Sequence, residues 1–500
     1  MTTQTAILIG LAIYACLMFG VSMFWMVRVK KATDYLVAGR GLPYLILTGT
    51  IVATCVGTGV VIGASGLAYQ HGWAGCAYPI GLGLGTLVTG LMFGKMRRYK
   101  FMTLSEEIAC YCGGNRIVVE FSNISLFFSQ LCWLTVQIMG GGAVLSVVTG
   151  LNPKICVVIA GFITAIISIP GGLKTVVYTD FVQAIILLCG FGFLTHAALA
   201  GAGGWSGLRQ SVPHEYFSFL GISSYGGWQV VSLILVLLLN PIADPGRRLT
   251  MYSAHSVKGA KWSMVTAGAI VIVFSIVVGI AGMYAFKLNP HLAKPDQAVP
   301  WLVMNVFPPW LAAVVVVSIA SAIFSSANGC AIAAGTFFVR HIYPLVTGRY
   351  AKHSLVAVRR ALVCAFVLST TIALYTGNIV GFVVKFLPLT MSGLAVIIVL
   401  GRFWKRTTWQ GALAALITTP AVSLIVMFVP GQQNFWKSPI IPATVAGVIA
   451  HFVVSWLTPP SRRGFEEIAE KLTRERQAVE GPGADEFGEG QPSGQAVTQL

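Results

Sequence analysis

Long apolar runs, separated by short polar and basic segments, recur along the whole 500-residue chain. A helix that crosses a bilayer needs roughly 20 apolar residues, and hydropathy predicts about thirteen such spans. They lie near residues 6–28, 43–70, 73–94, 118–149, 154–170, 175–200, 224–243, 262–287, 310–339, 360–376, 378–401, 410–429 and 440–457. The pattern predicts an all-α polytopic membrane protein.

Composition supports this prediction, because 56% of the residues are hydrophobic and 10% are charged. Soluble domains carry about 25% charged residues. The net charge of +17 does not indicate a nucleic-acid partner, since the basic residues form short clusters between apolar spans. We expect a multi-pass protein of the plasma or inner membrane, with the lipid bilayer around it and no obligatory protein partner evident.

The basic clusters also predict the direction of the chain across the membrane. Arg28 and Lys30 follow the first span, and Arg97 and Arg98 follow the third. Lysine and arginine are enriched in cytoplasmic loops, so these loops are expected inside. Alternation from there places Arg247 and Arg248 in a cytoplasmic loop as well, and it puts the N-terminus outside and the C-terminus inside.

Two predicted spans are discontinuous. The segment Thr48–Gly66 holds five glycines, and each interior glycine costs a helix roughly 1 kcal/mol relative to alanine. The segment Asn240–Gly246 holds two prolines, which remove backbone donors. Breaks within a bilayer are tolerated where the backbone lines a cavity, although the glycines of the first segment would also allow close helix packing.

The two breaks fall in the first helices of two successive five-helix groups, once the first span is set aside. Broken helices at corresponding positions of two halves point to an inverted-repeat transporter with a site at the midplane. The expected divisions are an extra helix and cytoplasmic loop (1–40), a first repeat (41–200), an external loop (201–223), a second repeat (224–401), two peripheral helices (402–457) and a largely disordered cytoplasmic tail (458–500).

Ala322, Ser325 and Ser326 share one helical face in the middle of the apolar segment Val316–Tyr343. Serines in such a position can bond to the carbonyl one turn earlier or pack against a neighbouring helix. They can also bind a ligand. The spacing alone does not decide between these readings.

Four stretches in order along the chain resemble the sodium/solute symporter family. They are GGLKTVVYTDFVQ (171–183), ADPGRR (243–248), SAIFSSAN followed by FFVRHIY (321–343), and GRFWKRTTWQGA (401–412). The resemblance, which runs from about Asp34 to Trp456, implies a LeuT-type 5+5 inverted-repeat core. It also implies sodium-coupled import of a small organic solute.

The resemblance carries the family's principal sodium site onto five residues of this chain. These are the backbone carbonyls of Ala53, Val56 and Ala322 and the hydroxyls of Ser325 and Ser326. Hard cations take several oxygen ligands, and an unwound backbone from residue 53 to 57 would supply neutral ones.

Asp180 matches the family's acidic residue on the route of the ion toward the cytoplasm or at a second ion site. An alternative is a helix-capping or interfacial carboxylate beside Thr179. Relatives with a second sodium site place hydroxyls where this chain has Asn328 and Gly329. We therefore expect Na⁺ as the coupling ion, with one ion per cycle.

The candidate substrate-binding residues are Thr54, Gln137, Asn240 and Lys385. Lys385 would lie about 12 Å into its helix from the outside. It could attract a substrate carboxylate in an outer vestibule, or its ammonium could snorkel to the interface. Interhelical hydrogen bonds are the alternative for Thr54 and Gln137.

The predicted function is a sodium-coupled secondary active symporter that imports a small organic solute by alternating access. A sugar is disfavoured, because Pro79 and Val384 stand where sugar carriers of the family have a glutamate and a glutamine. A proton-coupled carrier using Asp180, or a transporter-like membrane sensor, are the alternatives. An enzyme is not expected, since no span carries a nucleophilic, paired-aspartate or metal-binding constellation.

Overall fold

The computed structural model describes residues 2–26, 41–101, 103–168, 173–347, 354–460 and 464–480. Within these ranges the chain forms helices and no β-strand, apart from one isolated bridge between Leu42 and Ala254. This agrees with the predicted all-α class, because helices satisfy their own backbone hydrogen bonds in lipid.

Each apolar span predicted from the sequence overlaps a helix or a pair of helices, and the ends differ from the prediction by up to nine residues. The helices are α1 (Thr3–Met26), α3 (Tyr44–Cys55) with α4 (Ser65–His71), α5 (Ala77–Phe93), α7 (Arg116–Thr149), α8 (Pro153–Ser168), α9 (Leu173–Ala202), α12 (Gly227–Ala243) with α13 (Pro245–Tyr252), α14 (Val257–Leu288), α16 (Pro309–Phe337), α18 (Ser354–Leu374), α19 (Ile379–Phe403), α20 (Trp409–Phe428) and α22 (Ile440–Leu457).

By length and hydropathy, 9 helices of the described chain could cross a membrane, or 10 if the bent pair α12 and α13 forms one span. Three shorter apolar helices, Tyr44–Cys55, Pro153–Ile166 and Arg360–Leu374, add to these. The number of thirteen crossings and their direction stay predictions.

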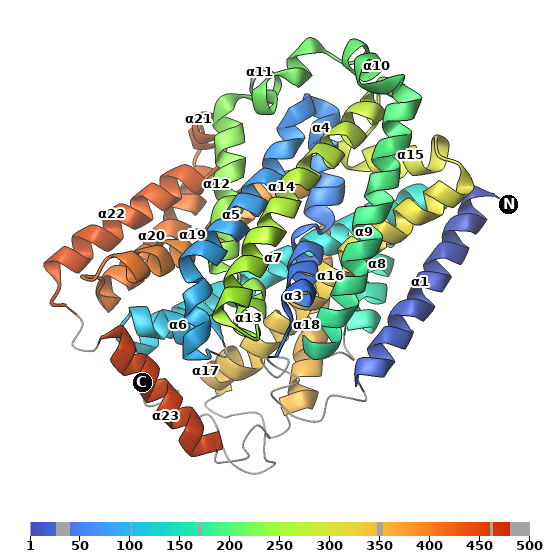
Figure 1. Ribbon diagram of the computed structural model, residues 1–500. Coiled ribbons are helices and arrows are strands. Elements are labelled where there is room, and N and C mark those ends of the chain that lie inside the picture. The colour runs from blue at the N-terminus through green and yellow to red at the C-terminus, as the bar shows by residue number, and fades with distance from the viewer. Residues whose placement is uncertain are drawn as a thin grey trace.

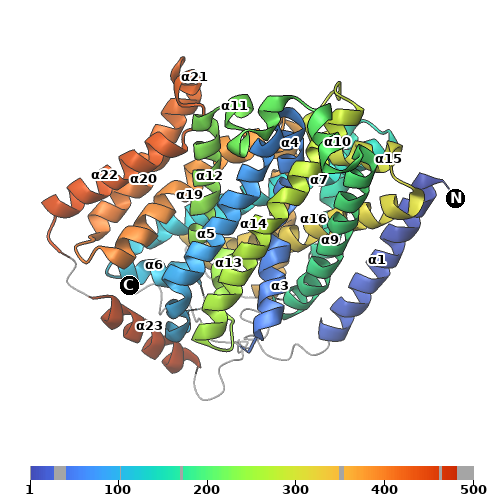
Figure 2. The ribbon, with the colours of Figure 1, turned by 45° about the horizontal axis from the view of Figure 1, so that its top comes forward.

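The central helices pack around the two breaks, and other helices flank them (Figure 1). α5 packs along α14 and α12, while α16 packs against α7 and α9. α1 lies at the edge of the bundle against α16 and α9, and α20 and α22 pack on each other at the other edge (Figure 2). The first span and the last two therefore lie at the edges of the bundle, and the division of the chain into repeats stays a prediction.

Short helices cover both ends of the bundle. α10 (Gly204–Ser211), within the predicted external loop, and α11 (Ile222–Tyr225), which runs two residues past it, lie at one end. α6 (Leu104–Tyr111) and the C-terminal α23 (Phe465–Glu480) lie at the other. The two contact each other, with the rings of Tyr111 and Phe465 5.2 Å apart.

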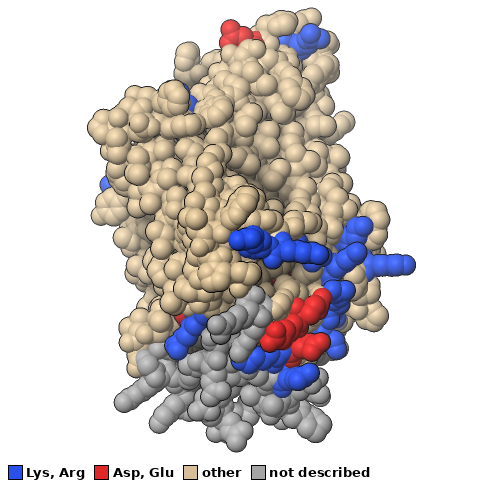
Figure 3. Space-filling view, turned by 90° about the vertical axis from the view of Figure 1, so that its left-hand side faces the viewer, with Lys and Arg blue, Asp and Glu red and all other residues tan. Residues whose placement is uncertain are grey.

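Two parts of the predicted divisions, the loop 27–40 and the tail segment 481–500, lie outside the described residues. In the rest, the charged side chains follow the pattern expected of a membrane protein. On the face shown in Figure 3 they gather toward the end that carries α23, and the broad area above is nearly free of charge. Large apolar side chains such as Phe19 and Leu424 are exposed on the outer helices, as contact with lipid tails requires.

Candidate functional site

The first break is short. α3 ends at Cys55, Val56 leaves helical geometry with φ −86° and ψ 57°, and a π-helical turn (η2, Gly59–Ala64) starts three residues later. The expected unwinding from residue 53 to 57 is therefore wrong at its start, since Ala53 and Thr54 are still helical. The Val56 N–H still bonds to the Val52 carbonyl at 2.8 Å, and the chain unwinds from Val56 onward.

The end of α3 presents carbonyls that the helix itself cannot satisfy, and α16 supplies donors for two of them. The Ser325 hydroxyl donates to the Ala53 carbonyl at 3.0 Å and to the Ala322 carbonyl at 3.2 Å. The Ser326 hydroxyl donates to the Thr54 carbonyl at 3.2 Å. Four predicted site residues, Ala53, Ala322, Ser325 and Ser326, thus meet where α3 crosses α16.

Val56, the fifth predicted ligand, is buried beside this cluster, at 0% exposure. The described contacts of its carbonyl do not join it to the serines. The next residue, Gly57, does approach α16, because a Cβ on it would overlap Ser326 Oγ and lie 3.2 Å from Gln137 Nε2. Glycine is what allows the close approach of backbone, serine and glutamine.

The second break lies at Asp244, between α12 and α13, whose axes differ by 46°. Asp244 caps α13 by accepting the Arg247 N–H at 3.0 Å, and Pro245 occupies the first turn. Asn240 was expected in this break but lies inside α12, which continues through Pro241. Its Nδ2 lies 2.8 Å from Met391 Sδ, and its Oδ1 accepts from Arg247 Nη1 at 2.5 Å.

A cavity of about 70 Å³ lies between the two breaks. At ~10–15 Å³ per water, this is room for roughly five water molecules. Thr54, Gln137, Asp180 and Ser326 are among the described residues that line it, and Lys385 and Asn240 are not. The structure therefore gathers four of the candidates and separates Lys385, on α19, from them.

Two of these residues, Thr54 and Gln137, contact the backbone near the first break. The Thr54 hydroxyl donates to the carbonyls of Thr50 and Ile51 at 3.0 and 3.1 Å. The Gln137 Oε1 accepts from the Thr58 N–H at 3.1 Å. The Thr54 bonds lie within α3, whereas the Gln137 amide joins α7 to the backbone at the first break, as the interhelical alternative expects. Contact of either residue with a solute stays a prediction.

Asp180 is fully buried in α9, and neither carboxylate oxygen has a hydrogen-bond partner among the described residues. α9 begins at Leu173, so Asp180 is not at the helix terminus and the helix-capping reading is wrong. The neighbouring Thr179 hydroxyl bonds to the carbonyls of Thr175 and Val176 instead. A bare buried carboxylate is costly unless a cation or proton compensates it.

Arg247 is a cavity residue whose position the sequence did not predict. Counting positive charges placed it in a cytoplasmic loop, whereas its side chain is 6% exposed and lines the cavity. The signal was available, because the residue follows Pro245 and Gly246 by only one or two positions. A helix restarted by such a break points its first turn into the bundle.

The family assignment agrees with this arrangement. A model of the family described as "Sodium:solute symporter family" matches residues 35–419. The chain belongs to the sodium:solute symporter family. Its members are transporters, so this symporter is a multi-pass membrane transporter and not an enzyme, and sodium is its coupling ion.

Individual relatives of this symporter are distant in sequence and similar over most of their length. The sodium/glucose cotransporter of Vibrio parahaemolyticus is 26% identical, over 85% of this chain and 85% of that protein. The sodium/pantothenate symporter of Escherichia coli (strain K12) is 24% identical, over 90% of this chain and 96% of that protein.

Solved structures confirm the LeuT-type fold. A Na⁺-coupled sialic acid symporter in a substrate-bound outward-open state superposes with a TM-score of 0.75 at 17% identity, covering 92% of this chain and 99% of that one. Mhp1, a nucleobase-cation-symport-1 family transporter, superposes with a TM-score of 0.55 at 13% identity, covering 87% and 98%.

Proposed function

We propose that this symporter imports a small carboxylate-bearing organic solute together with one sodium ion, by alternating access. The observation that carries the proposal is the meeting of Ser325 and Ser326 with the carbonyls at the end of α3. This observation concerns the ion site and not the class of solute.

The chemistry of this cluster suits sodium. Each serine hydroxyl has one donor and two acceptor lone pairs. In the present geometry the hydroxyls donate to the carbonyls of Ala53 and Thr54. Rotation of a hydroxyl would turn its lone pairs toward a cation that the freed carbonyls also coordinate. The proposed ligands are Ala53, Val56, Ala322, Ser325 and Ser326, all neutral, so an ion of single charge needs no buried counter-charge.

Binding at this place couples the ion to the conformation of the carrier. The ligands come from α3, the first half of a broken helix, and from α16, which packs against α7 and α9. A cation that joins them favours the arrangement in which they touch. Carriers with two broken helices alternate access by rocking one bundle against the other around such a site. We propose that sodium sets this equilibrium and that Asp180 lies on the exit route of the ion.

The solute is proposed to carry a carboxylate because Lys385 sits partly buried in the predicted outer third of α19. A lysine at that depth is expensive unless it faces water or an anion. Among the relatives and structures, pantothenate and sialic acid are carboxylates, while glucose is not. Thr54 and Gln137 are proposed to contact the solute within the cavity.

Proton coupling is the second candidate, and the bare carboxylate of Asp180 in the cavity favours it. Uptake into proteoliposomes separates the two. The probes are radiolabelled pantothenate, sialic acid and pyruvate, each with an inward NaCl gradient, with KCl in its place, or with an inward proton gradient. Sodium coupling predicts uptake of at least one acid with NaCl alone. Uptake that follows the proton gradient in KCl would replace it with proton coupling.

A further inference from the structure

The central cavity is lined by buried hydrogen-bond donors that have no partner among the described residues. They are Arg247 Nε, Gln130 Nε2, Trp133 Nε1 and the Tyr78 hydroxyl. These side chains are between 0% and 7% exposed. Buried polar atoms in native structures are nearly always paired with protein, water or a ligand. Within the described part of the chain, these four unpaired donors outnumber the two unpaired carboxylate oxygens of Asp180 in the same cavity, which favours a ligand that carries acceptor oxygens.

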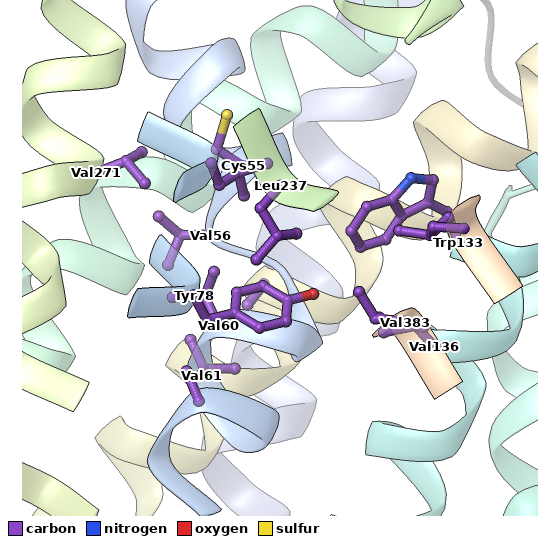
Figure 4. Close-up of a cluster of buried hydrophobic side chains, with 14 of the residues drawn as sticks. Cys55, Val56, Val60, Val61, Tyr78, Trp133, Val136, Leu237, Val271 and Val383 are labelled. Atoms are coloured by element: carbon purple, nitrogen blue, oxygen red, sulfur yellow. The ribbon is translucent and has the colours of Figure 1, made fainter. Parts of the chain in front are cut away.

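The donors come from three elements and lie around the same space. Tyr78 is on α5, Gln130 and Trp133 are on α7, and Arg247 is on α13. The Tyr78 hydroxyl lies against Gly59 at the first break, where a Cβ would overlap it. In Figure 4 this hydroxyl points toward the side of the cluster where Trp133 and Val383 lie.

Arg247 is placed to bind an anion. It lies in the first turn of α13, where the helix dipole favours negative charge. Its guanidinium has five N–H donors, of which Nη1 bonds to Asn240 Oδ1 at 2.5 Å. The ion pair with Asp244 is long, at 3.8 Å between Nη1 and Oδ2, and the other oxygen of Asp244 caps the helix. Cys55 also forms a hydrogen bond with the Arg247 side chain, and Nε is the guanidinium nitrogen that has no partner among the described residues.

The charges of the cavity do not by themselves decide between an anion and a cation, because Asp180 and Asp244 face it together with Arg247. The donors do decide. A quaternary or amine cation offers no acceptor to Tyr78, Gln130, Trp133 or Arg247, whereas a carboxylate offers two oxygens. A polyol would satisfy the neutral donors, but bonds between a guanidinium and a carboxylate are roughly twice as strong as neutral ones.

We propose that Arg247, assisted by the neutral donors of Tyr78 and Gln130, is the receptor for the carboxylate of the transported solute. The proposal rests on the transport function above and deepens it, since it names the residue that selects the substrate class. Lys385 and Arg247 then act at successive points, one at the entrance and one in the central cavity.

The test uses the purified full-length protein in detergent and pairs of compounds that differ only in the carboxylate. The pairs are propionate and propionamide, lactate and lactamide, pantothenate and pantothenol, and sialic acid and its methyl ester. The shift in thermal unfolding temperature is titrated with each compound in 150 mM NaCl, a concentration on the order of physiological ionic strength. The variants are Arg247→Gln, Arg247→Lys and, as a control outside the cavity, the exposed Arg209→Gln.

At least one acid is expected to stabilise the wild-type protein and Arg209→Gln, while its neutral partner does not. Arg247→Gln should need at least tenfold more of that acid for the same shift. Arg247→Lys, which keeps the charge without the fork, should fall between the two. The wild-type comparison of acid and neutral partner remains decisive even if Arg247→Gln fails to fold.

Three results would overturn the proposal: equal shifts from an acid and its neutral partner, an unchanged response in Arg247→Gln, or a wild type that no acid stabilises. A shift with choline instead of the acids would assign the cavity to a cation. The same samples titrated with NaCl against KCl report the sodium site separately. A lost sodium response with a retained acid response would contradict the proposed coupling and leave the carboxylate site standing.

Discussion

Glu107 holds together the end of the molecule opposite α10. It is fully buried on α6 and pairs with the fully buried Arg248 of α13. The hydroxyls of Tyr252 and Tyr111 donate to the same carboxylate, and the Arg248 guanidinium lies 4.2 Å from the ring centre of Phe93. Such a pair is favourable only while both charges and their hydrogen bonds are intact.

Glu107→Gln should therefore destabilise the protein by about 3–5 kcal/mol, because it leaves the Arg248 charge buried and uncompensated. Thermal unfolding in detergent measures the loss. The matched control is Glu466→Gln, which removes the partner of Arg98 in a pair whose side chains are 67% and 56% exposed. Exposed pairs contribute about 0–1 kcal/mol. Equal effects of the two substitutions would refute the structural role of Glu107.

Arg247 and the two serines show what residue patterns can and cannot predict. For the two serines, the sequence left both helix packing and ligand binding open, because their spacing does not show which carbonyls lie across from them. The packing of α16 on α3 shows that these are the carbonyls of Ala53 and Thr54. The topology prediction assigned Arg247 to a cytoplasmic loop, because that prediction counts positive charges and takes no account of where a side chain points.

At the scale of helices and their junctions, Asp296 joins the connection between α14 and α16 to the start of α19. Its Oδ2 accepts from the Ile379 N–H at 3.2 Å. The neighbouring Pro295 packs so closely on Gly66 of α4 that a Cβ there would lie 2.9 Å from the proline carbonyl. Burial raises the pKa of Asp296 to about 6, against the lowering effects of the Ile379 N–H and of Lys294.

The stability of this junction should depend on pH. Because the pKa of Asp296 is higher in the folded protein than in the unfolded chain, where it is near 4, the folded state holds the proton more tightly. The contribution of this group to stability is present at pH 4 and is lost as pH rises through about 6. Because the carboxyl is partly exposed, we expect its contribution to the free energy of unfolding to be about 1–2 kcal/mol.

Asp296→Asn keeps an acceptor for the Ile379 N–H but cannot ionise. Thermal unfolding at pH 5 and pH 8 should show a smaller difference for Asp296→Asn than for the wild type, with the variant gaining at pH 8. The control is Asn305→Asp, which places a new carboxyl at an exposed position of α15, where water solvates it. A pH profile of Asp296→Asn that coincides with the wild type would show that another group is responsible.

The elements themselves could be predicted well, because a bilayer requires long apolar helices and so makes hydropathy a sufficient signal. The positions of the breaks followed from glycine and proline. The extent of the breaks could not be predicted from these residues, because α12 continues through Pro241 and α3 stays helical to Cys55. α23 was not foreseen within the polar C-terminal tail, because its contact with α6 depends on Phe465 meeting Tyr111 and Phe101 across the fold.

At the scale of the whole molecule, the proposed ion and solute fix the energetics of transport. One sodium that enters with a monoanion moves no net charge, so the membrane potential does not contribute. A tenfold sodium gradient then supplies about 1.4 kcal/mol, which limits accumulation to about tenfold. A neutral solute would add about 2.3 kcal/mol per 100 mV and reach several hundredfold.

Uptake of the transported acid into proteoliposomes should therefore be insensitive to an inside-negative potassium diffusion potential set with valinomycin. The measurement compares initial rates and final accumulation with and without valinomycin, at the same NaCl gradient. A marked increase with the potential would contradict one sodium per monoanion, and would indicate a second sodium or a neutral solute.

The central claim is that sodium binds where α3 meets Ser325 and Ser326, and titration of thermal stability with NaCl tests it most directly. Ionic strength is held constant with KCl. A ligand at 100 times its dissociation constant stabilises the folded state by about 2.7 kcal/mol, so sodium should raise the unfolding temperature where potassium does not. Ser325→Ala and Ser326→Ala should each need at least tenfold more sodium. Ser321→Ala, one turn earlier on α16 with its hydroxyl on the Val317 carbonyl, should respond as the wild type does. Unchanged sodium dependence in both Ser325→Ala and Ser326→Ala would contradict the assignment.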